Sequence, residues 1–276
     1  NYFLFGYSVF EHTPFKDIKF LRYYSKLTVS KCKIQLVYKD DPILEKGILE
    51  AESTEAEAVN SINQYVELVE NSTSGDIIIP TSGGYDSRIL NMAIDDTNRI
   101  RSFTYGTSKN QSLSYEVIYA KKIAELLGTK WEQIELSNIN DYIDDWHRLF
   151  GFSTHLHGMY HIEFYKKILS SYTSNSDITL LSGIFGDVWA GNVELNSINS
   201  EKDVLKLGYT HGLSLDNDYI INPSDNRIRN QYYEENIENL KSYQYQIVST
   251  VRIKLVLISY LFKVPEYYGV PVWTIG

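Results

Sequence analysis

A short stretch rich in glycine and serine carries groups that could bind a phosphate chain. Residues 82–87 read Ser-Gly-Gly-Tyr-Asp-Ser and lie between an apolar run, 76–80, and a helix-like segment, 88–94. A strand, a glycine turn and a helix start, in that order, favour a pyrophosphate site. Glycine lets the backbone approach an anion, and the N–H groups of the first helical turn point toward it. We assign the phosphate contacts to Ser82, Gly83, Gly84 and Ser87 and a Mg²⁺ contact to Asp86.

The alternative is an ordinary turn that caps a helix, because Ser, Gly and Asp are common at both places. A second motif favours the phosphate site. Residues 182–187 read Ser-Gly-Ile-Phe-Gly-Asp and follow another strand-like run, 177–181. Neighbouring parallel strands form a ligand crevice at their carboxyl ends, so we expect Asp86 and Asp187 to face one metal–phosphate cluster.

The two loops together resemble the asparagine synthetase family, whose relatives include β-lactam synthetase. The resemblance covers about residues 50–270, with a strand like the family's second at 102–106 and its helix at 116–128. It implies an α/β fold of the PP-loop ATP pyrophosphatase type, adenine nucleotide alpha hydrolase-like. That fold has a parallel sheet with helices on both faces, here after a short antiparallel N-terminal remnant.

The resemblance also implies a reaction. A carboxylate attacks the α-phosphorus of ATP and releases pyrophosphate, and ammonia or an amine then displaces AMP, so the chain would be an AMP-forming carbon–nitrogen ligase. The implied cofactors are ATP and Mg²⁺. The implied nucleotide contacts are Pro80, Tyr105, Ser182 and Gly183, and the implied catalytic residues are Asp86, Asp187 and Lys263. The alternative for Lys263 is a structural role, because a lysine at the end of an apolar helix interacts favourably with the helix dipole.

Two positions depart from the family pattern. Ile184 and Val188 stand where asparagine synthetases carry acidic residues, and isoleucine cannot act as a base. This favours an acid other than aspartate as substrate. Arg88 stands where the family has a small residue, and it could bind a phosphate or carboxylate or serve the structure. Two further interpretations stay open: another PP-loop synthetase of the NAD or GMP synthetase type, and a degenerate, non-catalytic nucleotide-binding or assembly homologue.

The ends of the sequence predict the domain organisation. Residues 13–21 resemble the junction that follows the family's glutamine-hydrolysing domain, so we expect 1–50 to be the end of a glutamine-amidotransferase-like domain and its linker. We expect 51–276 to be the synthetase domain, truncated at its C-terminus. A glutaminase domain in the intact protein or in trans, or free ammonia or an amine, is the expected nitrogen source, and a homodimer is left open.

Composition excludes several classes of function. The net charge of −9 argues against nucleic acid and anionic membranes as partners. The single cysteine, Cys32, excludes an intramolecular disulfide and indicates a reducing compartment, which we take to be the cytoplasm. The apolar run 256–262 is too short to span a bilayer.

Apolar periodicity predicts the elements that position the loops. Residues 1–50 alternate in the manner of antiparallel strands, and a helix opens at 53–55 with Val59, Ile62, Val66 and Val69 on its apolar face. Gly128 is the expected end of a helix. The other expected helices are 87–95, 114–127, 140–150, 157–171 and 228–264, the expected strands are 76–81, 99–105, 131–136 and 178–182, and 197–226 is an expected surface loop. His155, His157 and His161 form a cluster that favours ordinary polar or pocket residues over a metal site.

Overall fold

The computed structural model describes residues 13–21, 25–31, 33–39, 53–151, 158–173, 176–184, 186 and 262–275. The described residues before residue 53, with Phe150 and Gly151, belong to one compact unit and the others to a second. Several predicted features lie outside the described residues: Cys32, His155, His157, Asp187, Val188, the loop 197–226 and most of the helix predicted at 228–264.

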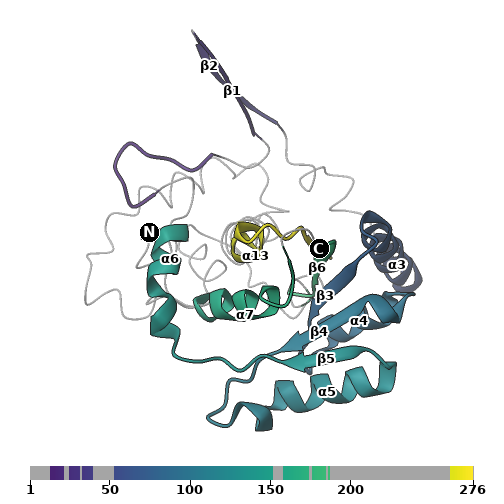
Figure 1. Ribbon diagram of the computed structural model, residues 1–276. Coiled ribbons are helices and arrows are strands. Elements are labelled where there is room, and N and C mark those ends of the chain that lie inside the picture. The colour runs from purple at the N-terminus through teal and green to yellow at the C-terminus, as the bar shows by residue number, and fades with distance from the viewer. Residues whose placement is uncertain are drawn as a thin grey trace, which may run out of the picture. The chain divides into compact units, whose positions relative to one another are not determined.

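A five-stranded parallel sheet forms the centre of the second unit (Figure 1). Its strands are β3 (Asp76–Pro80), β4 (Ile100–Thr104), β5 (Lys130–Gln133), β6 (Ile178–Ser182) and β7 (Val272–Thr274). They run in the order β5-β4-β3-β6-β7, and all four neighbouring pairs are parallel. The carboxyl ends of β3 and β6 therefore lie next to each other at one edge of the sheet, as the sequence predicts.

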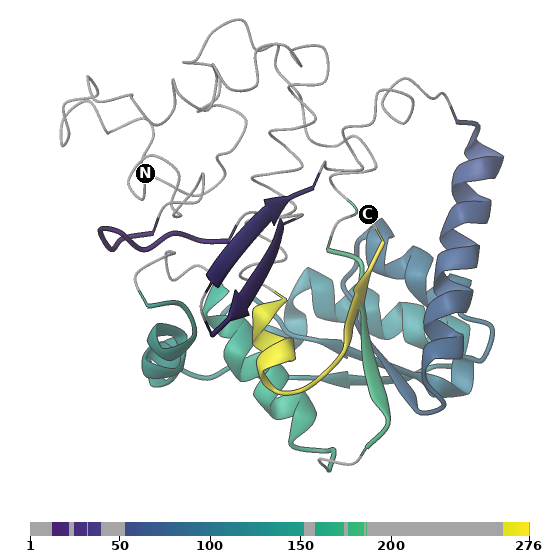
Figure 2. The same cartoon turned by 90° about the horizontal axis from the view of Figure 1, so that it is seen from above.

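Helices cover both faces of this sheet. On one face lie α3 (Glu55–Ser72), α4 (Tyr85–Ala93) and α5 (Tyr115–Leu127); on the other lie α7 (Tyr160–Leu169) and α13 (Lys263–Tyr267), with α6 (Ile143–Phe150) leading to α7 (Figures 1 and 2). Short 3₁₀ turns, η2 (Thr97–Arg99), η3 (Gln111–Leu113) and η4 (Ile139–Tyr142), connect them. The predicted α/β architecture is confirmed.

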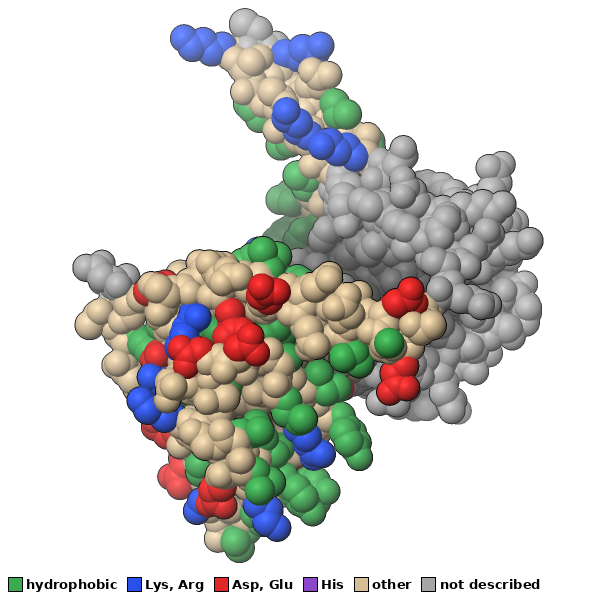
Figure 3. Space-filling view, turned by 90° about the vertical axis from the view of Figure 1, so that its right-hand side faces the viewer, with side chains coloured by type: hydrophobic (Ala, Val, Ile, Leu, Met, Phe, Trp, Pro, Cys, Tyr) green, Lys and Arg blue, Asp and Glu red, His purple; other side chains and the backbone are tan. Residues whose placement is uncertain are grey.

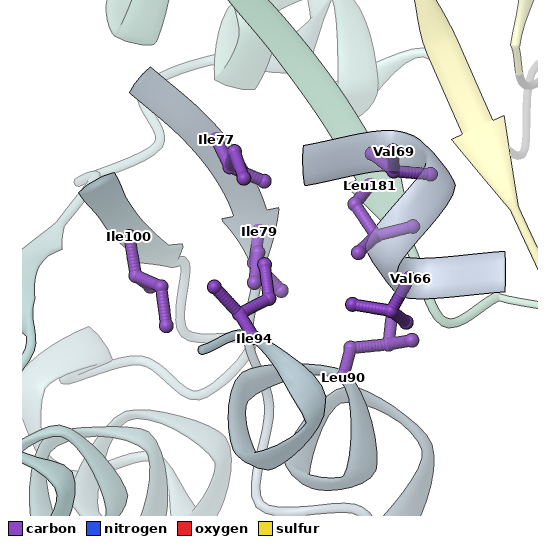
Figure 4. Packing of buried hydrophobic residues seen from close by; sticks show 8 residues of the cluster. All are labelled: Val66, Val69, Ile77, Ile79, Leu90, Ile94, Ile100 and Leu181. Carbon is purple, nitrogen blue, oxygen red and sulfur yellow. The ribbon is translucent and has the colours of Figure 1, made fainter. Parts of the chain in front are cut away.

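The core between β3 and its helices consists of aliphatic side chains (Figure 4). Ile77 and Ile79 are fully buried on the α3 and α4 side, and Ile78, between them in β3, is buried on the opposite side. Each such side chain contributes about 1.5–3 kcal/mol when it leaves water. The other members are Val66, Val69, Leu90, Ile94, Ile100 and Leu181. This core holds the end of β3 and the start of α4 in a fixed relation.

The predicted start of α3 and the predicted end of α5 are confirmed. Thr54 caps α3 with a capping box that includes Glu57, and Gly128 ends α5 with φ of 68°. The predicted apolar face of α3 is only partly right: Val66 and Val69 are buried, but Val59 is 50% exposed, because only the C-terminal half of α3 packs on the sheet. Helix α4 begins at Tyr85, two residues earlier than predicted.

The C-terminal strand β7 was not predicted, and β5 ends at Gln133, three residues before the predicted end. Strand β7 pairs with β6, joining Leu181 to Trp273. A three-residue strand carries too little alternation to be detected from sequence. In the described part of the chain, no helix is both long enough and apolar enough to cross a membrane.

The first unit contains an antiparallel hairpin, β1 (Ser25–Ser30) and β2 (Lys33–Tyr38), which confirms the predicted N-terminal antiparallel element. Leu27 lies opposite Leu36, and Val29 lies opposite Ile34, on one face of the ribbon. These side chains are exposed, and lysines lie along the same ribbon (Figure 3). The assignment of this segment to a glutaminase-like domain stays a prediction.

Candidate functional site

The first loop, residues 82–87, lies where β3 ends and α4 begins. Gly84 is the N-cap of α4, with φ of −73° and ψ of 167°, and as a glycine it has no side chain to cap the helix. The N-terminal end of a helix favours an anion, which could take the place of a capping side chain. Asp86 lies in this first turn, where the helix dipole favours a carboxylate.

The two serines of this loop hold its shape from inside. The backbone N–H of Ser82 donates to Oγ of Ser87 at 3.1 Å, and the Ser87 hydroxyl donates to the Ser82 carbonyl at 3.4 Å. The N–H of Gly84 donates to Oγ of Ser82 at 3.1 Å. Ser87 is only 5% exposed. In this structure both hydroxyls close the loop, and their predicted role as phosphate donors stays a prediction.

Arg88 supports the same loop. Its Nη2 donates to the Gly83 carbonyl at 3.2 Å, and its guanidinium lies 4.9 Å from the centre of the Tyr85 ring. Both contacts are to residues of the first loop, so of the two roles that the sequence left open, these contacts favour the structural one.

The described residues of the second loop, 182–184 and 186, lie directly on the first turn of α4. The loop turns back on itself through a hydrogen bond from the Gly186 N–H to the Gly183 carbonyl at 3.0 Å. A Cβ added to Gly183 would come within 3.0 Å of the carbonyl carbon of Asp86 and the nitrogen of Ser87, and a Cβ added to Gly186 would overlap the Asp86 side chain. Only glycine permits this approach, and the two loops meet at Asp86.

The meeting point contains one candidate magnesium ligand. Carboxylate oxygens are preferred Mg²⁺ ligands, and the Asp86 side chain lies where the second loop crosses the N-terminal end of α4. Asp187, the predicted second ligand, lies outside the described residues, so its pairing with Asp86 stays a prediction. Within the described ranges, no three His, Cys, Asp or Glu side chains form a group that could hold a metal.

The two residues predicted to contact adenine lie on the same face of the sheet. Pro80 is the register partner of Phe103 in the β3–β4 pair. Tyr105 directly follows β4, two residues after Phe103, so in an extended chain the two side chains point to the same face. The Tyr105 ring packs at 5.3 Å from Tyr160 and 5.1 Å from Phe164, both on α7. Burial raises the pKa of the Tyr105 phenol, which therefore stays neutral. Much of this ring already serves packing, and its contact with adenine stays a prediction.

Lys263 and His161, the one described member of the predicted histidine cluster, have local partners. Lys263 begins α13, and its ammonium pairs with Glu266 at 2.6 Å on the same helix. His161 packs against the Tyr160 ring at 4.5 Å between ring centres. Neither observation places these side chains at the first loop, and the catalytic role of Lys263 stays a prediction.

Glu163, two residues after His161, has a buried carboxylate that is bound by side-chain and backbone partners. Glu163, 1% exposed, accepts hydrogen bonds from the backbone and hydroxyl of Ser137 and pairs with Lys167 at 2.7 Å. Burial alone would raise the pKa of Glu163, but the bonds from Lys167 and Ser137 outweigh it and hold this pKa below its ordinary value. Glu163 therefore ties α7 to the segment that follows β5.

No family model matches this chain, and no curated protein sequence matches it significantly. Solved structures resemble it at low identity. An NH3-dependent NAD synthetase from Campylobacter jejuni is 13% identical with a TM-score of 0.36, over 79% of this chain and 96% of that one. A glutamine-dependent NAD+ synthetase from Acinetobacter baumannii, bound to ADP, is 14% identical with a TM-score of 0.35, over 78% and 47%.

A U34-tRNA thiolase from Methanococcus maripaludis, with its [4Fe-4S] cluster, is 14% identical with a TM-score of 0.29, over 75% of this chain and 77% of the thiolase. At identities of 13–14% and TM-scores below 0.5, these likenesses carry no conclusion about the function of this chain.

Proposed function

We propose that the chain binds ATP with Mg²⁺ at the first loop and uses it to adenylate a carboxylate, which ammonia or an amine then converts to an amide. The observation that carries the proposal is the meeting of the two loops at Asp86, where Gly183 and Gly186 lie against the first turn of α4. A pyrophosphate there would face the N-terminal end of α4, whose N-cap residue is a glycine.

The residues of the chain have distinct parts in this reaction. The first turn of α4 and the glycines of the first loop would orient the β- and γ-phosphates and leave the α-phosphorus open to attack. Asp86, with Asp187, would hold Mg²⁺, which neutralises charge on the departing pyrophosphate. The carboxylate oxygen forms a bond to the α-phosphorus as the bond to pyrophosphate breaks, and the nitrogen nucleophile later displaces AMP.

More specifically, we propose that the reaction is of the asparagine-synthetase type and that the substrate is an acid other than aspartate. Ile184 supports the change, because it puts an apolar side chain where that family has an acidic one. Its N–H donates to Oγ of Ser182 at 3.3 Å, so it belongs to the same turn as the predicted nucleotide contacts. A glutaminase domain in cis or in trans as nitrogen source, a homodimer and a cytoplasmic location belong to the same proposal.

The test is ATP–pyrophosphate exchange by the purified full-length protein with a panel of carboxylic acids. The panel should contain aspartate, other amino and sugar acids and nicotinic acid adenine dinucleotide. Xanthosine monophosphate, which is activated at a ring carbonyl oxygen and not at a carboxylate, is added to detect the GMP synthetase type. Exchange that depends on one acid supports the ligase and names its type. ATP binding without exchange for any acid supports the non-catalytic homologue.

Two variants make this test specific to the site. Asp86→Ala should abolish exchange, whereas Asp141→Ala, at an exposed position on η4, should leave it unchanged. Full exchange by Asp86→Ala would refute the assigned site even if the chain proved to be a ligase.

A further inference from the structure

A buried set of hydrogen bonds fastens both ends of the first loop. Asn91, on the second turn of α4, is 1% exposed. Its Nδ2 donates to Oγ1 of Thr81 at 3.0 Å and to the Ser87 carbonyl at 2.7 Å. Thr81 directly precedes the loop and Ser87 ends it. One side chain therefore holds the residues at both ends of the loop.

The same set of bonds continues into the sheet. Oδ1 of Asn91 accepts from the hydroxyl of Ser102 at 2.9 Å. The hydroxyl of Thr104 donates to the Thr81 carbonyl at 2.5 Å and accepts from Nε1 of Trp131 at 3.1 Å. Ser102 and Thr104 belong to β4 and Trp131 to β5, so the start of the loop is tied to two neighbouring strands.

The direction of each bond is fixed by chemistry. The Ser87 oxygen is a carbonyl, which only accepts, so the amide nitrogen of Asn91 must face it. Thr81 Oγ1 accepts from Asn91 and gives its own hydrogen to the Ile79 carbonyl at 3.0 Å. Both hydrogens of the Asn91 amide and its oxygen are thus engaged. A buried polar network that is fully satisfied in this way rigidifies the groups it joins.

We propose that Asn91 is a positioning residue that sets the first loop in its phosphate-binding shape before the nucleotide arrives. The inference rests on the proposed function, because the shape matters only if the loop binds a phosphate chain. A loop that is already ordered loses less conformational entropy on binding. Without Asn91, ATP would have to order residues 82–87 itself, and its affinity would fall.

A matched pair of substitutions separates positioning from general stability. Thr81→Val removes one contact of Asn91, and Thr179→Val removes a hydroxyl of similar burial that donates to the Pro271 carbonyl at 3.2 Å, away from the loop. Asn91→Leu removes all three bonds and keeps the branched shape of the side chain, with methyl groups in place of the amide oxygen and nitrogen. ATP affinity is measured by calorimetry at a temperature where each variant is folded, and amide hydrogen exchange is measured on the free proteins.

Because a bond of about 1 kcal/mol corresponds to about fivefold in affinity, Thr81→Val should weaken ATP binding about fivefold and Asn91→Leu, which loses three bonds, about a hundredfold. Amides of residues 82–87 should exchange faster in both, and Thr179→Val should change neither quantity. Unchanged affinity and unchanged loop exchange in the Thr81 and Asn91 variants would overturn the inference. If wild-type protein fails to bind ATP, the proposed function falls, while loop exchange still decides whether Asn91 holds the loop.

Discussion

The substitution Gly186→Ala examines the meeting of the two loops without any assay of activity. An added Cβ would overlap the Cβ and the carboxyl group of Asp86. Because the overlap includes the Asp86 Cβ, rotation of the carboxylate alone cannot relieve it. Either the second loop or the first turn of α4 must move. Overpacking of this kind costs about 1–3 kcal/mol of unfolding free energy.

A double-mutant cycle assigns that cost to the contact. Asp86→Gly removes the side chain that the new methyl group would meet, so Gly186→Ala should cost much less in this background. We expect a coupling energy of about 1–2 kcal/mol, in the range found for residues in direct contact. Denaturant unfolding, monitored by circular dichroism, gives all four free energies.

The control cycle pairs Gly186→Ala with Asp141→Gly, at an exposed aspartate of η4. There the cost of the alanine should be the same in both backgrounds. If Gly186→Ala costs equally with and without the Asp86 side chain, the loops do not meet at Asp86, and the reasoning about a shared phosphate and metal site is refuted.

Three further predictions concern polar contacts that connect the elements of the second unit. Glu163→Gln should lower the free energy of unfolding by about 1–2 kcal/mol, because the charged partner of Lys167 is lost. Since the pKa of Glu163 is lowered in the folded protein, its stabilising effect is present above pH about 4.3 and is lost as pH falls through the folded pKa. Denaturant unfolding at a series of acid pH values should therefore show the difference in stability between wild type and Glu163→Gln disappear. Hydrogen bonds from Thr73 and Ser74 lower the pKa of Asp177 to about 2, so its stabilising effect should persist to lower pH, and Asp177→Asn should raise the pH midpoint of acid unfolding. Arg88→Lys should weaken the support of the Gly83 carbonyl and lower stability with little change in the identity of the acid substrate; a changed preference in the exchange assay would show that Arg88 contacts substrate.

The sequence predicted the parts of the site that depend on local pattern. Continuous apolar runs such as 77–79 marked buried parallel strands, and the glycine turn after the first run marked the loop. The rule that parallel strands end at one edge then predicted that Asp86 would lie near the second loop, because β3 and β6 are neighbours in the sheet.

The rest depended on contacts between distant segments. Strand β7 pairs with β6 about 90 residues away in sequence, and three residues carry no clear alternation. Asn91 falls within a predicted helix, and the sequence offers one signal of its hydrogen-bonding role: it lies four positions after Ser87, on the same face of that helix. The packing of Tyr105 on α7 could not be predicted, because aromatic residues fit a ligand pocket and a core equally well.

The central claim is that the first turn of α4 and Asp86 together hold a nucleotide triphosphate and its divalent ion. The most direct measurement is a crystal structure with a non-hydrolysable ATP analogue and Mn²⁺ in place of Mg²⁺, with the metal located from its anomalous signal. The account predicts a manganese peak in contact with the Asp86 carboxylate and phosphate oxygens on the N–H groups of the first loop. A nucleotide bound at another edge of the sheet, or a metal without contact to Asp86, would contradict it.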